Sequence, residues 1–168
     1  MARGTVYHLS TDPESMGSMD ESNFYDSLDR LNVDFVQNEN PENSESSITW
    51  LRDKLASSGF EIISETLPKN CAFAFRTGDK NALKQAKMAW FKDRHDALKR
   101  FLTALSLEDF AVSTSKAFQI SELAEDPRGD AVWLDEGYGV CTKNLLDTIR
   151  DLAPDTVFYV AKNTVLMH

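Results

Sequence analysis

Apolar residues recur along this chain with two periods, which predict strands interspersed with helices. Short β-branched and aromatic runs predict strands over residues 5–9, 60–67, 71–77, 115–121, 131–136 and 156–161, with 165–167 extending or pairing with the last. Apolar residues spaced three and four apart predict helices over residues 22–31, 47–58, 80–105 and 142–152. The helix over 80–105 is the longest expected element, and Leu83, Trp90 and Phe101 lie on its broad apolar stripe.

Local signals fix some of the boundaries of these elements. Gly59 followed by Phe60 is typical of a helix that ends on a left-handed glycine and then buries an apolar residue. The short polar link between 60–67 and 71–77 favours an antiparallel hairpin. Within its second strand, strict alternation places Cys71, Phe73 and Phe75 on one face.

The order of these elements indicates an α+β fold. We expect an antiparallel or mixed sheet with helices packed on one face, in a ferredoxin-like (split βαβ) order followed by a C-terminal β-α-β extension. The length of 168 residues favours one domain over 1–168. Polar stretches predict acidic surface loops at 10–21 and 37–47, and a further loop over 106–114.

Charge is unevenly distributed along the chain, whose net charge is −9. Residues 10–66 carry thirteen acidic and three basic side chains, whereas 76–100 carry eight basic and three acidic ones. Such an acidic surface attracts a basic protein over a long range. The expected contact residues are Asp12, Glu14, Asp20, Glu21, Glu39, Glu42 and Glu45. The simpler interpretations are that acidic loops serve solubility, or that the basic helix offsets the acidic charge within the molecule.

Several functional classes lack their sequence signals. The chain has no zinc-binding, nucleotide-binding or calcium-binding motif, so we expect neither a metal nor a cofactor. A net negative chain repels nucleic acid, and no apolar run is long enough for a membrane helix. Two cysteines and no apolar leader favour free thiols in the cytoplasm. The leading hypothesis is therefore a non-catalytic protein-binding or regulatory module.

A small-molecule site or enzyme, with a cleft between the long helix and the sheet, is the alternative. Arg94 falls on the apolar stripe of that helix and could bind an anion there, or form an internal salt bridge to Asp135 or Glu136. A strand, a glycine loop and a helix beginning near Thr142 would resemble a phosphate-binding turn, although its carboxylates oppose that ligand. The candidate ligand-binding residues are Arg94, His95, Asp135, Glu136, Tyr138 and Cys141.

Two of these features have simpler explanations. The glycines at 137 and 139 fit a tight turn, and Cys141 fits an inert thiol as well as a reactive one. A third hypothesis is a homo-oligomer whose subunits share the apolar face of a helix.

Overall fold

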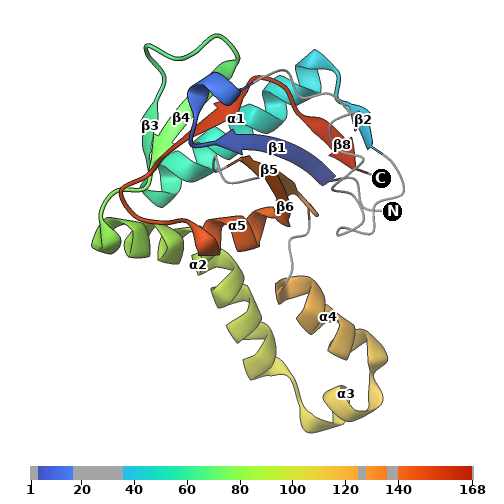
Figure 1. Ribbon diagram of the computed structural model, residues 1–168. Helices are drawn as coiled ribbons and strands as arrows, with labels where there is room; N and C mark the ends of the chain where they lie inside the picture. The colour runs from blue at the N-terminus through green and yellow to red at the C-terminus, as the bar shows by residue number, and fades with distance from the viewer. Residues whose placement is uncertain (1–3, 17–35, 125–127, 136–139, 168) are drawn as a thin grey trace.

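The computed structural model describes residues 4–16, 36–124, 128–135 and 140–167, and its architecture is α+β (Figure 1). The strands are β1 Gly4–Ser10, β2 Val36–Asn38, β3 Glu61–Ile63, β4 Cys71–Arg76, β5 Ala131–Asp135, β6 Val140–Asn144, β7 Val157–Ala161 and β8 Val165–Met167. The helices are α1 Pro41–Ser58, α2 Lys80–Ala104, α3 Leu107–Val112, α4 Thr114–Ala124 and α5 Leu145–Asp151, and a 3-10 turn, η1, covers Pro13–Ser15.

Strand β1 lies at the centre of one sheet. It pairs in parallel with β5 on one side and antiparallel with β7 and β8 on the other, and β6 continues the sheet beyond β5. Strands β4 and β3 lie beyond β7, and β2 lies beyond β8. The ferredoxin-like order is not confirmed, because β7 lies between β1 and β4 instead of leaving them adjacent. The C-terminal strands thus enter the middle of the sheet rather than extending its edge.

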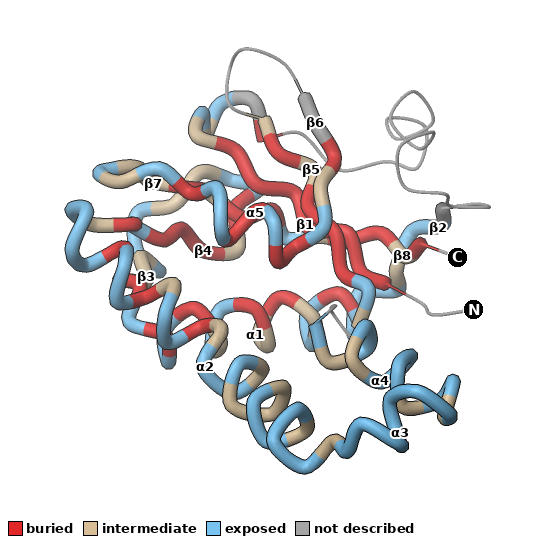
Figure 2. The backbone as a smooth tube through the Cα atoms, turned by 90° about the horizontal axis from the view of Figure 1, so that it is seen from below, coloured by how far each residue is buried: buried red, intermediate tan, exposed pale blue. Residues whose placement is uncertain are grey.

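The main core lies between one face of the sheet and helices α1, α2 and α5. The four central strands contribute Tyr7, Leu9, Phe73, Phe75, Val132, Leu134, Phe158 and Val160. The helices contribute Ile48, Leu51, Leu55, Leu83, Ala86, Trp90, Leu145 and Ile149. Figure 2 shows the buried residues gathered in the sheet and these helices. The amphipathic patterns therefore identified the helical stripes of α1 and the first half of α2 correctly.

Helix α1 begins earlier than expected, so the surface loop expected over 37–47 is wrong. Residues 36–38 form β2, and the side chain of Asn40 accepts a hydrogen bond of 2.9 Å from the Asn43 amide at the helix start. Pro41 fits the first helical position because its missing amide hydrogen needs no partner there. The end of α1 is as expected: Gly59 has a φ of 101°, and the Phe60 amide donates to the Leu55 carbonyl.

Three other expectations are corrected. Residues 115–121 lie in helix α4 rather than in a strand, and 106–114 contain helix α3 rather than only a loop. Residues 142–144 belong to strand β6, which pairs antiparallel with β5, so α5 begins only after Asn144. The Asn144 side chain accepts a hydrogen bond from the Asp147 amide, and this cap defines the true helix start.

The expected alternation in β4 fails at its first residue. Cys71 pairs with Ala161 and Phe73 pairs with Val160, so a β-bulge interrupts the register between them. Cys71 consequently packs with Met16 and Ala161, away from the main core that holds Phe73. Burial raises the pKa of the Cys71 thiol. The helix expected over 22–31 lies outside the described residues, as do residues 17–21 of the loop expected over 10–21.

The side chain of Asp130 connects the turn before β5 to strand β1 through hydrogen bonds. Its side chain is buried and accepts hydrogen bonds from the Thr5 amide (2.9 Å) and from Arg128 Nε (2.7 Å). The Arg128 guanidinium also lies 4.0 Å from the ring centre of Trp50 on α1. This one carboxylate therefore links the sheet, the turn and, through Arg128, helix α1.

We expect Asp130→Ala to lower the free energy of unfolding by about 2 kcal/mol, because it leaves a buried amide without its acceptor. Chemical denaturation of both proteins at pH 7 measures the change. Asp53→Ala is the control, since the exposed Asp53 pairs only with its neighbour Arg52 and should change stability by less than about 0.5 kcal/mol. Equal effects of the two substitutions would contradict this role for Asp130.

Candidate functional site

A helical arm, defined here as residues 91–124, projects from the body of the molecule (Figure 1). It consists of the second part of α2 together with α3 and α4. None of its residues is buried, whereas the first part of α2 buries Leu83, Ala86 and Trp90 against the body. The same continuous helix thus contributes to the core at one end and leaves the core at the other.

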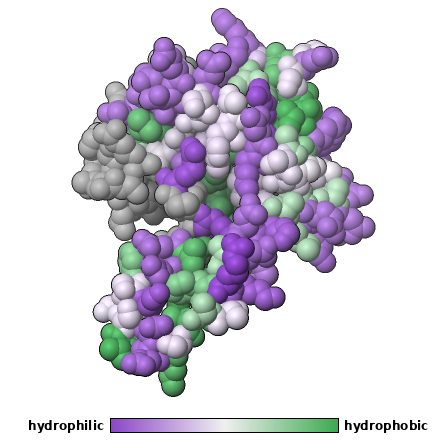
Figure 3. Space-filling view, turned by 180° about the vertical axis from the view of Figure 1, so that it is seen from behind, coloured by the Kyte–Doolittle hydropathy of each residue, from purple (hydrophilic) through white to green (hydrophobic). Residues whose placement is uncertain are grey.

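Large apolar side chains are exposed on this arm. Among the described residues, five of the six exposed large hydrophobic side chains belong to it: Leu102, Leu107, Phe110, Val112 and Phe118. Leu107 is 84 % exposed and Phe118 64 % exposed. Figure 3 shows hydrophobic side chains along the arm between polar ones. Exposed apolar groups gathered on one substructure are typical of a protein-interaction site.

Helix α4 packs against α2, but no residue of α3 or α4 is buried. Arg94 on α2 donates a hydrogen bond of 3.4 Å to the Leu123 carbonyl on α4. The Lys116 ammonium lies 5.8 Å from the centre of the Phe101 ring. Helices of six and eleven residues without buried side chains are marginal in water, because packing supplies most helical stability in proteins. A partner covering the arm would supply that packing.

The charges of the arm are balanced but ordered along its length. Its five basic and five acidic residues cancel, although the chain carries −9 in total. The second part of α2 carries four basic and two acidic residues, with Lys99 and Arg100 exposed in its last turns, whereas Glu108 and Asp109 are exposed on α3 at the far end of the arm. The arm therefore has a basic segment and an acidic tip.

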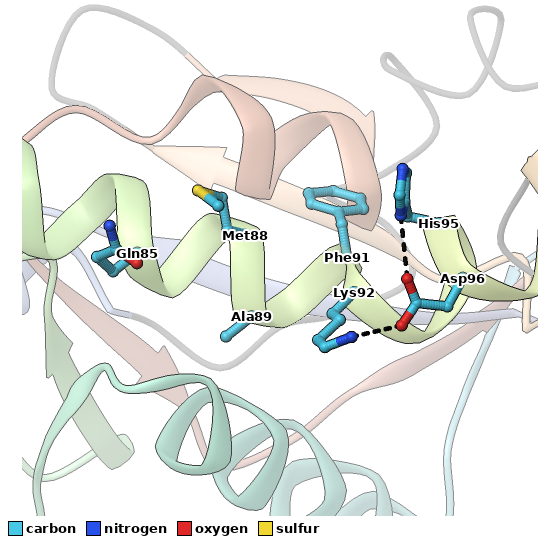
Figure 4. A pocket seen from close by; sticks show the side chains of 7 residues that line it. All are labelled: Gln85, Met88, Ala89, Phe91, Lys92, His95 and Asp96. Atoms are coloured by element: carbon cyan, nitrogen blue, oxygen red, sulfur yellow. Dashed lines mark hydrogen bonds and ion pairs between the residues drawn. The ribbon is translucent and has the colours of Figure 1, made fainter. Parts of the chain in front are cut away.

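A shallow hollow on α2 lies where the arm begins (Figure 4). Its lining residues are Gln85, Met88, Ala89, Phe91, Lys92, His95 and Asp96. Asp96 forms an ion pair with Lys92, which lowers the pKa of Asp96 and raises that of Lys92. His95 Nδ1 lies 3.1 Å from the other carboxylate oxygen of Asp96 and lowers its pKa further. The seven lining residues that the structure describes all belong to α2.

The expected ligand-binding residues lie on different elements. Arg94 and His95 are on α2, and His95 is an exposed residue. Asp135 ends β5, where its carbonyl accepts from the Thr11 amide, and Cys141 lies in β6 opposite Leu134. The expected phosphate-binding turn is wrong in one respect, because strand β6 stands where its helix should begin. Glu136 and Tyr138 lie outside the described residues.

The described acidic candidates occupy two places. Asp12 and Glu14 are exposed and follow the C-terminal end of β1. Glu42 and Glu45 are exposed in the first turns of α1, and Glu39 accepts a hydrogen bond from the Thr164 hydroxyl. Because α1 begins beside the turn between β7 and β8, these three residues form a group of their own. Asp20 and Glu21 lie outside the described residues.

The sequence analysis missed His8, which the structure buries in β1. Its side chain faces away from the main core, and its ring centre lies 4.6 Å from that of Trp133 on β5. Neither ring nitrogen has a hydrogen-bond partner among the described residues, and removal from water lowers the pKa of His8 to about 4. The expected strand over 5–9 gave no signal for this environment, because the strands that bury His8 come from the C-terminal part of the chain.

The neighbouring Tyr7 faces the main core instead. Its hydroxyl donates a hydrogen bond of 3.4 Å to the Ser47 carbonyl on α1. Burial, helped by the nearby charge of Asp130, raises the pKa of Tyr7 above its usual range. The phenol is therefore neutral and anchors α1 to the central strand.

Two searches of the described residues complete this survey. No three His, Cys, Asp or Glu side chains gather there in a way that could hold a metal ion. No helix in the described ranges is long and apolar enough to cross a membrane.

Comparison with known proteins identifies no relative. No protein-family model, no curated protein and no solved structure matches this chain significantly. Its function therefore has to be inferred from its own residues.

Proposed function

We propose that this protein is a non-catalytic protein-binding or regulatory module whose contact surface is the helical arm. The observation that carries the proposal is the exposure of Leu102, Leu107, Phe110, Val112 and Phe118 on an arm in which no residue is buried. Apolar surface of this kind is costly to leave in water, and a protein partner removes that cost by covering it.

The division of the molecule into body and arm supports this function. The body has a main core supplied by the sheet and three helices, so it does not need the arm's apolar side chains for its own packing. Binding surfaces built on a stable scaffold can present side chains that contribute nothing to folding. The arm fits that description.

Further parts of the sequence-based hypothesis stay predictions. A basic partner for the acidic residues would find Glu42 and Glu45 exposed beside the start of α1. The cytoplasmic location stays a prediction. A small-molecule site would need Arg94 or His95 to combine with residues of β5 and β6.

Site-specific photo-crosslinking in cells of the source organism tests the arm. We expect a cross-linking residue in place of Phe118 to give a discrete protein adduct, because this side chain is exposed on α4. The same residue in place of Glu61, exposed on the sheet edge at β3, is the control and should give none. The proposal fails if Phe118 and Glu61 give the same products, or if neither position gives an adduct.

A further inference from the structure

We propose that the arm is covered by the arm of a second copy of this chain, in an antiparallel pair with two-fold symmetry. This inference rests on the proposed function, since it names the partner of the same surface. It also specifies which residues of the two copies meet.

The order of charges along the arm suits self-association. In an antiparallel pair, the acidic tip of each copy lies against the basic segment of the other. Lys99 and Arg100 of one copy then face Glu108 and Asp109 of its partner. Because a two-fold interface repeats every contact, this charge pairing occurs at both ends of the interface. An interface that is basic throughout or acidic throughout could not pair with itself in this way.

The apolar side chains follow the same symmetry. A two-fold axis near the junction of α2 and α3 brings Leu102 of one copy towards Leu107 of the other. Leu107 is 84 % exposed and Leu102 47 % exposed, so both have apolar area available to cover. Phe110 on α3 adds an aromatic side chain to the same end of the arm. The pair thus has an apolar centre and a charged rim, which is the usual composition of a protein interface.

The net charge of the molecule also favours this surface over the others. Two copies that each carry −9 repel one another at long range. The arm is the long exposed segment whose own charges cancel, and it projects away from the body (Figure 1). Contact through the two arms therefore keeps the acidic bodies apart.

Charge reversal on the full-length chain tests the pairing. Light scattering coupled to size-exclusion chromatography should give the wild type a mass of twice 18.9 kDa. The variant Lys99→Glu with Arg100→Glu, and the variant Glu108→Lys with Asp109→Lys, should each weaken self-association at least about tenfold because like charges then face each other.

Two combinations separate the interface from damage to a helix. Mixing the two variants should restore a dimer containing one copy of each, since an acidic arm then faces a basic arm across both halves of the interface and both arms keep their apolar centre. The variant with all four reversals should dimerise by itself, because its basic and acidic ends are only exchanged. Helix unfolding alone would not be rescued in either experiment.

The possible outcomes distinguish this inference from the proposed function. A monomeric wild type at 200 µM (about 3.8 mg/ml), or a dimer that none of the reversals weakens, would overturn the second copy as the partner. If the Phe118 cross-link then joins the chain to a different protein, the protein-binding function stands without self-association. If no adduct forms at all, both proposals fail.

Discussion

Lowering the pH from 7 to 4 should remove about 3 kcal/mol of stability through His8 alone. Burial lowers the pKa of His8 from its ordinary 6.5 to about 4 in the folded state. The unfolded chain therefore binds a proton on His8 at a pH where the folded chain does not, and each unit of pKa difference corresponds to about 1.4 kcal/mol. The loss begins as the pH falls below 6.5 and is complete below 4.

A variant that cannot titrate isolates this effect from that of the carboxylates. His8→Phe keeps an aromatic ring beside Trp133 and removes two buried nitrogens that have no partner. It should be at least as stable as the wild type at pH 7. Between pH 7 and pH 4, the difference in free energy of unfolding between the variant and the wild type should grow by about 3 kcal/mol in favour of the variant. Urea denaturation across this pH range measures both values.

His95→Phe is the matched control for this prediction. The side chain of His95 is 72 % exposed on α2, so its replacement should leave the large acid-induced loss of stability through His8 in place. Parallel pH profiles for the wild type and His8→Phe would show that His8 is not buried as a neutral ring.

Phe75→Ala should lower the free energy of unfolding by about 4 kcal/mol, whereas Phe110→Ala should change it by less than about 0.5 kcal/mol. Phe75 is fully buried between Phe60 and Phe158, whose ring centres lie 5.7 and 5.4 Å from its own. Truncating it leaves a cavity in the main core. Phe110 is 53 % exposed on α3 and loses few contacts.

The two variants form a matched pair, since the same chemical change is made in the body and in the arm. Chemical denaturation below the concentration at which the chain self-associates measures the intrinsic stability of each. A cost of 2 kcal/mol or more for Phe110→Ala would mean that the arm's apolar residues serve the fold of a single chain. That result would remove the main argument for a binding surface.

Sequence patterns predicted the elements that make up the main core. The apolar stripe of α1, its glycine end and the alternation of Phe73 and Phe75 each arise from contacts that repeat locally. The errors arose where local pattern is ambiguous. Residues 115–121 alternate like a strand over a short window, but they belong to helix α4, which contacts α2 through Lys116 and Leu123.

Capping residues were an available signal that the sequence analysis did not use. Asn40 before Pro41, and Asn144 three residues before Asp147, mark helix starts that the structure confirms. The absence of apolar residues over 37–47 was given more weight than that cap. Helix α1 can begin with polar residues because its first turns lie at the surface beside Thr164.

The candidate site was harder to predict, because hydrophobicity in a sequence does not distinguish a core from an interface. Leu107, Phe110 and Phe118 have the residue types of a core and yet lie exposed. They are exposed because α2 continues beyond Trp90 away from the body, and no local pattern encodes where a helix leaves the core.

The central position of β1 has a consequence for how the chain folds. Its partners β5, β7 and β8 come from residues 131–167, and the Thr5 amide bonds to a residue 125 positions away. Contacts between residues so far apart in sequence form slowly, because closing the long loop between them costs conformational entropy before the contacts stabilise the fold. The strand at the centre of the finished sheet is therefore completed late. Until then its backbone is open on both edges to pairing with another chain, which makes the early stages of refolding the point of greatest exposure to aggregation.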